Sequence, residues 1–574
     1  MVDLTRENYL TNAKLLLRGL WYADLPDLMD IEELEEAIEE VLNEIDNQNI
    51  AGYKHDVDNF ILDVSGITSP PYIRSPGVEA TSFFDFKKNK SLREMQIPHL
   101  LHYVSFIYNT LLEFESIFEA LYIDPDNAQF VANSNSYLVF EDEFILHMYD
   151  GEEQCISAGV FTTKNNKISS SAVLAENKRR MLDAEADYLY SLKMDIESFF
   201  PNLYTHNFER MAKKSPFSSL GVDVRYFEFL DKFHQRINNN QTKGIPAGTF
   251  SSHVAAELCM LCVDDEIRSH LRKRKCNVSY VRYVDDLTFF SDSESELAEL
   301  CPVVQSILNQ YRLRINGHKT ESIHTVYSSQ PAYMNELEQM FPKLKTEEMA
   351  TVLTIGDFFF IKKYAGACLK EGRSSQLRAL LTMLLRKLQS EKLRIDTIST
   401  ELFNFLLKLV FEDVSLTSHI YRMLEYLLCS ATETAPLIEA LKRKQAKIDT
   451  EYPDTILQIW HYYILFLHSS DEERNAMVSA LKSQHVNPLV ATAMVLPGKE
   501  KNRELYKLIC DQYKQESGST QWKKEIMNSK WWLPLFKISR YDSHDYDNLM
   551  SSENFPELLR MFQNHTAHGD DADL

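Results

Sequence analysis

Two adjacent aspartates, Asp285 and Asp286, lie between two short apolar segments, and this pattern constrains the fold more than any other. Residues 278–284 and 287–290 are rich in aliphatic, β-branched and aromatic side chains. Apolar runs on both sides of a short acidic turn predict a β-hairpin with both carboxylates at its tip. Because neighbouring carboxylates repel each other, a hard cation such as Mg²⁺ would stabilise the pair. A solvated Asp-Asp turn is the plain alternative.

A third carboxylate, Asp195, lies near the start of a similar segment. Residues 192–201, Leu-Lys-Met-Asp-Ile-Glu-Ser-Phe-Phe-Pro, predict an apolar strand that runs into an acidic end. Two strands that bring Asp195, Asp285 and Asp286 together would form a two-metal site for in-line phosphoryl transfer.

Between these strands lies a glycine-containing loop, residues 244–252, which opens a predicted helix over residues 249–271. Gly244 and Gly248 would let the backbone approach a base pair or a nucleotide closely. Glycine near a helix start is also common without any function. We expect the helix to pack beneath the hairpin.

The order of these segments resembles that of the reverse transcriptases. Asp195 with the two phenylalanines after it resembles their first catalytic motif, and residues 244–252 resemble their template- and nucleotide-positioning loop. Residues 283–286, Tyr-Val-Asp-Asp, resemble their YxDD hairpin, and residues 313–320 resemble the next motif, which ends in Asn-x-x-Lys-Thr. Residues 93–103 resemble an Ile-Pro-His segment of the bacterial members. The five motifs cover about residues 90–325.

This resemblance implies roles for particular residues. Asp195 and Asp285 would hold two Mg²⁺ ions, for which Mn²⁺ can substitute, with Asp286 in support and the Ile196 carbonyl as a further ligand. Phe200 would be a steric gate that excludes the ribose 2′-hydroxyl, and Lys319 would protonate the leaving pyrophosphate. A core phenylalanine and a surface lysine are the alternatives. The implied nucleotide-binding set also includes Gly244, Ile245, Pro246, Gly248, Lys178 and Arg179.

The predicted fold class is α+β, with a right-hand polymerase fingers-palm core followed by an all-α, repeat-like C-terminal domain. The 574 residues exceed a single hydrophobic core. We divide them into a helical and loop region at 1–90, a fingers and palm domain at 91–330, a helical domain at 331–545 and a partly disordered tail at 546–574. Leucine-rich amphipathic helices at 376–388, 400–411, 416–429 and 455–467 indicate a helical array.

Other segments carry further predictions of local structure. Helices are expected at residues 5–20, 31–45 and 100–114, the segment 208–239 is expected to be helical, and short strands are expected at 136–140 and 155–163. The aromatic segment 530–536 is expected to dock onto the body of the protein, in preference to stacking on bases.

The formal net charge is −23, which is unusual for a protein that binds nucleic acid, because phosphate contacts need Lys and Arg. A candidate nucleic-acid contact stands just before the hairpin, at Arg272, Lys273, Arg274 and Lys275. The solvated end of a helix is the alternative. The scattered cysteines indicate a reducing cytoplasm, and because no apolar run approaches 18 residues we expect no membrane segment.

The chain departs from the processive reverse transcriptases because no Leu-Gly primer-grip motif follows Thr320. That absence, the acidic charge and the helical C-terminal half together resemble the abortive-infection and defence-associated bacterial enzymes. Some of those synthesise DNA without a template and prime from their own tyrosine. Tyr9 and Tyr22 are candidate primers because they lie in the short N-terminal region. The expected partners are dNTPs, a DNA product or an RNA template, and either a second copy or a partner defence protein.

Three other functions fit parts of the pattern. A conventional reverse transcriptase that copies a dedicated RNA, as in retrons, would carry the same motifs. An RNA-dependent RNA polymerase would share the carboxylates, but Val284 and Phe200 argue against it. A catalytically idle scaffold would not need the three carboxylates and Lys319.

Overall fold

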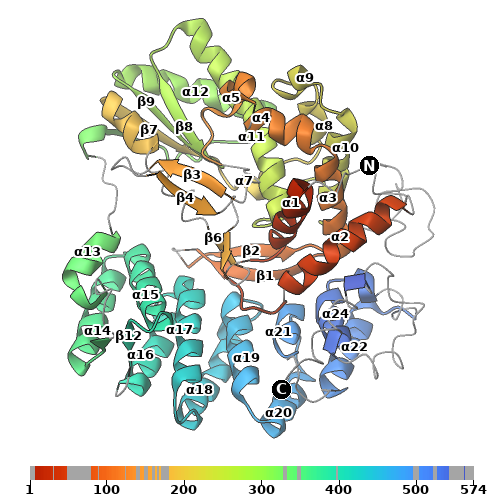
Figure 1. Cartoon of the computed structure of the whole chain (residues 1–574), viewed down its shortest axis with the longest axis vertical. Helices are drawn as coiled ribbons and strands as arrows, with labels where there is room; N and C mark the ends of the chain where they lie inside the picture. The colour runs from red at the N-terminus through yellow and green to blue at the C-terminus, as the bar shows by residue number, and fades with distance from the viewer. Residues whose placement is uncertain are drawn as a thin grey trace.

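The computed structural model describes most of the chain. The described residues are 7–22, 24–29, 31–47, 79–87, 90–122, 124–136, 143–147, 153–157, 162–164, 167–169, 180–327, 333–344, 351–395, 398–495, 503–520, 522, 526–541 and 561–562. Among them are a mixed α/β upper half and an array of helices below it (Figure 1). The α+β class and the helical C-terminal part are therefore confirmed, whereas the domain boundaries stay a prediction.

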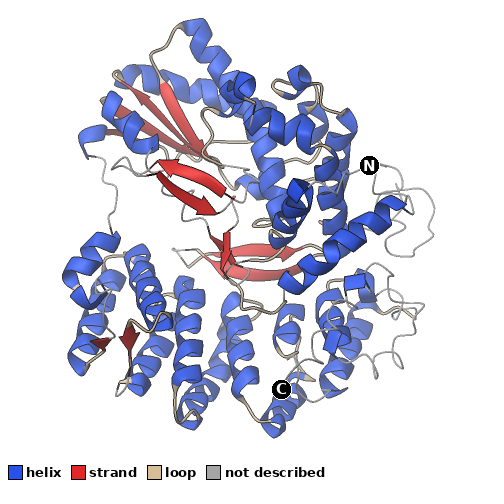
Figure 2. Ribbon diagram, viewed as in Figure 1, coloured by secondary structure: helices blue, strands red, loops and turns tan. Residues whose placement is uncertain are grey.

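A four-stranded antiparallel sheet lies at the upper left of the upper half in the view of Figure 2. Its strands are β7 (Tyr190–Asp195), β8 (Ser279–Tyr283), β9 (Asp286–Ser291) and β10 (Glu321–His324), in the order β10-β7-β9-β8. β8 and β9 form the predicted hairpin, with a turn at residues 284 and 285. The apolar side chains of β9, Leu287, Phe289 and Phe290, are all buried, so the hairpin is part of the core.

The long helix α11 (Phe250–Arg274) begins where the sequence predicts it, because the side chain of Thr249 accepts a hydrogen bond from the backbone N–H of Ser252 and caps the helix. Its side chains bond to β8 through Asp264 and Glu257, so it lies beneath the hairpin as expected. Helix α12 (Glu294–Gln310) follows β9 and packs against β7 and β9.

The segment 208–239 is helical, as the sequence predicts, but the helical structure is interrupted. Three helices occupy the region: α8 (Asn207–Met211), α9 (Phe217–Leu220) and α10 (Val224–Arg236). Gly221 ends α9 with a left-handed φ of 71°, and the Asp223 side chain then caps α10 by accepting from the Arg225 N–H.

The N-terminal helices and four short hairpin strands complete the upper half. Helices α1 (Glu7–Arg18) and α2 (Ile31–Asn47) match the predicted ranges, and α1 packs on α3 (Leu100–Leu112). The hairpin strands are β3 (Glu143–His147) with β4 (Glu153–Ser157), and β5 (Thr162–Lys164) with β6 (Lys167–Ser169). Residues 137–140 of the strand predicted at 136–140 lie outside the described residues.

The lower half is an array in which helices contact near neighbours along the chain, including α15 with α17, α17 with α19, and α19 with α21. All four helices predicted in this region are present. The array comprises α13 (Tyr333–Met340), α14 (Ile355–Lys370), α15 (Ser374–Gln389), α16 (Ser399–Glu412), α17 (Thr417–Ser430), α18 (Ala435–Glu451), α19 (Ile456–His468), α20 (Asp471–Leu481), α21 (Pro488–Ala493), α22 (Arg503–Ser517) and α24 (Trp532–Tyr541).

The array is joined to the upper half through β1 (Thr81–Phe86), which pairs with β2 (Leu92–Ile97). The Phe84 N–H donates to the Asp454 carbonyl at 2.8 Å, and the side-chain amide of Asn487 donates to the Ser82 carbonyl at 2.9 Å. These bonds satisfy polar groups of an edge strand that would otherwise be unpaired.

The aromatic segment 530–536 docks onto the body as predicted. Trp531 and Trp532 are fully buried, and the Trp532 ring lies 5.0 Å from the His99 ring, measured between centroids. The Nε2 atom of His99 is 2.8 Å from the Met527 carbonyl oxygen. His99, from the Ile-Pro-His segment, therefore holds the C-terminal helices against α3.

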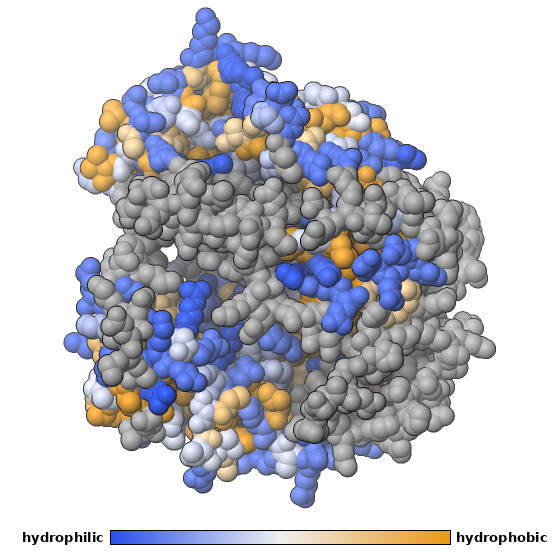
Figure 3. All heavy atoms as spheres, viewed as in Figure 1, coloured by the Kyte–Doolittle hydropathy of each residue, from blue (hydrophilic) through white to orange (hydrophobic). Residues whose placement is uncertain are grey.

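The described surface shows no single dominant apolar area in the view of Figure 3, where hydrophobic side chains occur in several separate groups. No described helix combines the length and apolar character that a membrane crossing needs.

Replacing Trp532 by alanine tests whether this docking stabilises the fold. We expect a loss of about 3–5 kcal/mol in the free energy of unfolding, because the change removes a fully buried ring. Urea unfolding measures it, with Phe359→Ala as the control, since the Phe359 side chain is 60% exposed. A loss below about 1 kcal/mol, no larger than an ordinary single substitution, would contradict this role.

Candidate active site

The three predicted carboxylates come from neighbouring strands at one edge of the sheet. In the register of β7 with β9, Asp195 lies opposite Asp286. The Ile196 N–H donates to the Asp285 carbonyl at 3.3 Å, so the strand end and the hairpin turn are directly joined. Asp195, Asp285 and Asp286 are therefore brought together, whereas their binding of two metal ions stays a prediction.

The segment 313–320 folds back onto Asp195. The Lys319 ammonium donates to Asp195 Oδ1 at 2.9 Å, and the Asn316 side-chain amide donates to Oδ2 at 3.2 Å. A turn closed by a bond from the Lys319 N–H to the Asn316 carbonyl places both side chains on the same carboxylate. Asn316 belongs to the Asn-x-x-Lys-Thr motif, but sequence reasoning assigned it no role.

The electrostatics of the site favour a bound cation. Burial, together with the charges of Asp286 and Asp195, raises the pKa of Asp285 to about 6. Burial also raises the pKa of Asp286, although Lys193 at 3.8 Å opposes this effect. The hydrogen bond from Lys319 to Asp195 raises the lysine pKa and keeps the ammonium charged. An all-oxygen donor set whose carboxylates repel each other fits a hard divalent ion such as Mg²⁺.

The hairpin turn contains a strained residue. Val284 has a φ of 53°, in the left-handed region that β-branched residues rarely adopt. Such a conformation costs about 1–3 kcal/mol and persists only where the surroundings hold it. Its N–H donates to the Ser136 hydroxyl at 2.6 Å, and its carbonyl accepts from the Arg282 guanidinium at 3.1 Å.

The glycine loop packs closely, but against the protein itself. Gly248 has a φ of 94°, and an added Cβ would lie 2.1 Å from Cε1 of Tyr22. Gly244, with a φ of 87°, lies against the Pro201 backbone. Gly248 thus closely approaches the Tyr22 ring, and Ile245 and Pro246 are buried beside it, whereas the nucleotide-binding role of these residues stays a prediction.

Phe199 is buried and Phe200 is half-buried, so one phenylalanine of the pair is core, as expected. The Phe200 ring meets the His253 ring edge-on at 5.6 Å between centroids. Ile196 is 1% exposed, and the role of its carbonyl as a metal ligand stays a prediction.

Both candidate priming tyrosines are buried, and the structure does not support either of them as a primer. The Tyr9 hydroxyl donates to Glu115 at 2.7 Å. The Tyr22 hydroxyl lies 2.6 Å from the Gln96 carbonyl and 2.7 Å from the Ala247 carbonyl, and burial raises its pKa. A nucleophilic hydroxyl must reach a nucleotide, whereas Tyr22 holds the loop that contains Gly248.

The predicted basic residues are not brought to the carboxylates. Arg272, Lys273, Arg274 and Lys275 are exposed at the C-terminal end of α11, where cations stabilise the helix dipole. This cluster precedes the start of β8, whereas Asp285 follows its end, so the strand separates them. Lys178 and Arg179 lie outside the described residues, and Arg180 is the first residue described after them.

A protein-family model matches the part of the chain that contains these residues. Residues 152–353 match the family described as "Reverse transcriptase (RNA-dependent DNA polymerase)". This part of the chain is similar to the reverse transcriptases. Within the matched residues lie all three carboxylates, the glycine loop and Lys319.

One curated relative is the Retron Se72 reverse transcriptase of Salmonella heidelberg (strain 579083-10). It is 29% identical over 159 residues, which cover 27% of this chain and 39% of that protein. The match thus spans about two fifths of the relative's length.

Among solved structures, the apo telomerase of Candida tropicalis is 13% identical, with a TM-score of 0.32 over 69% of this chain and 70% of that one. The telomerase of Candida albicans, solved with a TWJ fragment of telomeric RNA, is 13% identical, with a TM-score of 0.30 over 73% of this chain and 68% of that one.

Substitution of Asp285 by asparagine is expected to stabilise the metal-free protein at neutral pH. Folding raises the pKa of Asp285 from its ordinary value of 3.8 to about 6, so the charged carboxylate destabilises the folded protein. This destabilisation grows as the pH rises from about 4 to above 6. We expect a gain on the order of 1 kcal/mol at pH 7.5, allowing for partial solvent exposure, and a smaller gain at pH 5.

Thermal unfolding with a chelator present measures this difference. Asp195→Asn serves as the comparison, because that change removes a carboxylate already paired with Lys319 and should give no gain. Equal or lower stability of Asp285→Asn at pH 7.5 would argue against the electrostatic description of the site.

Replacing Gly248 by alanine should destabilise the loop, because the new methyl group would overlap the Tyr22 ring. A loss of about 1–3 kcal/mol is expected from the overlap and the positive φ. Gly366→Ala is the control, because its Cβ meets nothing within 4 Å and alanine favours its helix. Unchanged unfolding of Gly248→Ala would show that Tyr22 does not fix the loop.

Proposed function

We propose that the protein is a reverse transcriptase-type DNA polymerase that adds dNTPs by Mg²⁺-dependent phosphoryl transfer. The observation that carries the proposal is the convergence of Asp195, Asp285 and Asp286 at one sheet edge, with Lys319 on the same cluster. The family match supports the reaction class.

In the proposed mechanism Asp195 and Asp285 hold two divalent ions, and Asp286 supports them. When bound, the ions lower the pKa of the primer hydroxyl and stabilise the charge on the triphosphate and the leaving pyrophosphate. Lys319, which donates to Asp195 in the metal-free site, is exposed enough to turn towards the pyrophosphate and give it a proton.

Discrimination between sugars is assigned to Phe200. Its ring is half-buried and supported by His253, so it presents a fixed apolar edge. A ring held in this way excludes a 2′-hydroxyl more sharply than a mobile one, because it cannot move aside without losing its packing. We therefore expect deoxynucleotides to be preferred.

We propose a role in antiphage defence in the bacterial cytoplasm, for which the retron relative is the supporting observation. Template-independent, protein-primed synthesis is one mode of action. Because the Tyr9 and Tyr22 hydroxyls are buried and bonded to other groups, the primer in that mode would be a different tyrosine. A conventional enzyme that copies a dedicated RNA is the second candidate, which the retron relative favours.

Incorporation of labelled dNTPs tests the proposal. Wild type is compared with Asp285→Ala plus Asp286→Ala, with Mg²⁺ and dNTPs, first without a template and then with a primed RNA. The double variant should fall to the background of the reaction without protein, because it lacks two of the three ligands. Asp292→Ala, at the other end of β9, removes an exposed aspartate and should stay active.

Label on the protein band without a template would indicate protein priming, and extension of the primed RNA alone would indicate conventional copying. Incorporation by the double variant at the wild-type rate would contradict the proposed site. No incorporation by wild type in either format, with ribonucleotides tried as well, would favour the scaffold alternative.

A further inference from the structure

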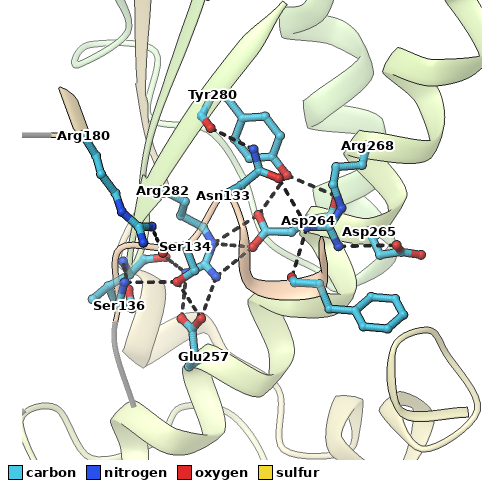
Figure 4. Close-up of polar contacts among 12 residues, drawn as sticks. Asn133, Ser134, Ser136, Arg180, Glu257, Asp264, Asp265, Arg268, Tyr280 and Arg282 are labelled. Carbon is cyan, nitrogen blue, oxygen red and sulfur yellow. Dashed lines mark hydrogen bonds and ion pairs between the residues drawn. The ribbon is translucent and has the colours of Figure 1, made fainter. Parts of the chain in front are cut away.

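Arg282 is a fully buried arginine two residues before the turn of the catalytic hairpin. All five of its N–H donors have acceptors. Nε and Nη2 donate to Asp264 Oδ2 at 2.9 and 2.8 Å, and Nη1 and Nη2 donate to the two Glu257 oxygens at 2.8 and 3.0 Å. The remaining donor, on Nη1, reaches the Val284 carbonyl at 3.1 Å. Figure 4 shows the guanidinium between the two carboxylates.

The two carboxylates are supplied by one face of α11, because Glu257 and Asp264 are seven residues apart, or about two turns. Their excess negative charge is met by two hydroxyl donors. Ser134 donates to Glu257 at 2.7 Å, and Tyr280 donates to Asp264 at 3.3 Å. Burial alone lowers the pKa of Arg282, but the two carboxylates raise it well above the ordinary value, so the guanidinium stays charged.

The segment 133–136 runs beside β8 and supplies the hydrogen-bond acceptor for the Val284 N–H. The Arg282 N–H donates to the Asn133 carbonyl at 2.7 Å, and the Asn135 N–H donates to the Arg282 carbonyl at 2.7 Å. These bonds place the Ser136 hydroxyl 2.6 Å from the Val284 nitrogen. Arg180 adds a further support, donating to the Ser134 carbonyl at 3.2 Å and to the side-chain oxygen of Asn135 at 3.1 Å.

Val284 is thus held from both sides. Its N–H bonds to Ser136 and its carbonyl bonds to Arg282, while its φ of 53° lies in a region that valine avoids. A residue in such a conformation relaxes unless its neighbours prevent it. Relaxation would rotate the peptide that leads into Asp285.

We propose that Arg282 and Ser136 are positioning residues, which hold Val284 in its left-handed conformation and so fix Asp285 and Asp286 for metal binding. This inference rests on the proposed polymerase function and concerns the geometry of the same site. Neither residue touches the reacting atoms; both act through the Val284 backbone. Groups that orient metal ligands in this way commonly change metal affinity or activity about 10–100-fold when removed.

The first test is Ser136→Ala, which removes the acceptor for the Val284 N–H but leaves the buried ion pairs intact. The probe is Mn²⁺ alone, whose binding is followed by electron paramagnetic resonance and does not require activity. We expect binding to weaken about 10-fold, and kcat with dNTPs to fall with little change in KM. Ser116→Ala, a half-buried serine bonded to Glu113, is the control.

The second test is rescue by Val284→Gly in the Ser136→Ala background. Glycine adopts a positive φ without steric cost, so it removes the need for the serine. We expect Mn²⁺ affinity to return most of the way to the wild-type value. A serine that merely stabilised the fold would give no rescue, because Val284→Gly restores no lost contact.

Arg282→Lys tests the positioning role of Arg282. Lysine keeps the positive charge but lacks the planar guanidinium that bonds to both Glu257 and Asp264 and to the Val284 carbonyl. We expect folded protein, checked by circular dichroism, with weaker Mn²⁺ binding than wild type. All titrations are made in a His206→Ala background, since His206, Glu209 and Asp231 form a separate group whose ligand atoms lie within 4.8 Å of one another and which could bind the probe ion.

The outcomes separate the two proposals. Mn²⁺ binding that depends on Asp285, without polymerisation by wild type, would contradict the proposed function alone, and the Mn²⁺ titrations would still decide on Ser136 and Arg282. Wild-type Mn²⁺ affinity in Ser136→Ala, or failure of Val284→Gly to rescue it, would overturn the positioning role. Absence of Mn²⁺ binding at the three carboxylates of wild type would overturn both.

Discussion

The pairing of β7 with β9 is the interaction on which the site depends. In this register Asp195 lies opposite Asp286, and residues 287–291 of β9 are all buried. A shift of one residue would move each side chain to the other face of the sheet, so Leu287 and Phe289 would lose their packing positions and Asp286 would no longer lie opposite Asp195. Burial of Leu287 and Phe289 therefore fixes the positions of the acidic groups beside them. Hydrophobic packing and the placement of charge are thus determined by one register.

The same site is a source of instability that the rest of the molecule must offset. Several carboxylates lie close together, one with a pKa raised to about 6, and a valine is held in an unfavourable backbone conformation. Such costs are typical of functional sites, where selection acts on geometry more than on stability. The buried ion pairs of Arg282 support the site, and the helical array is joined to β1 by one backbone and one side-chain hydrogen bond.

Local patterns in the sequence predicted the elements that carry the chemistry. The hairpin around Asp285, the strand that ends at Asp195 and the helix beginning after Thr249 each depend on neighbours within a few residues, and all three are present. The break of the region 208–239 into three helices could also have been read from Pro216 and Gly221, since both residues interrupt helices.

Contacts between distant segments could not be read in the same way. Tyr22 contacts the loop of Gly248 although more than two hundred residues separate them in the chain, so the sequence alone does not indicate the contact. From the sequence, Gly248 was interpreted only as a nucleotide-binding residue. Arg282 was missed although a signal existed. Glu257 and Asp264 are charged residues on one face of a largely apolar helix, which predicts a buried cationic partner but not which one.

The most direct test of the account is to locate the metal ions themselves. Crystals of the protein grown with Mn²⁺ and a non-hydrolysable dNTP analogue would be measured at a wavelength where manganese scatters anomalously. The account predicts two anomalous peaks coordinated by Asp195 and Asp285, with Lys319 no longer bonded to Asp195. Peaks absent from these carboxylates, or found only beside His206, Glu209 and Asp231, would contradict it.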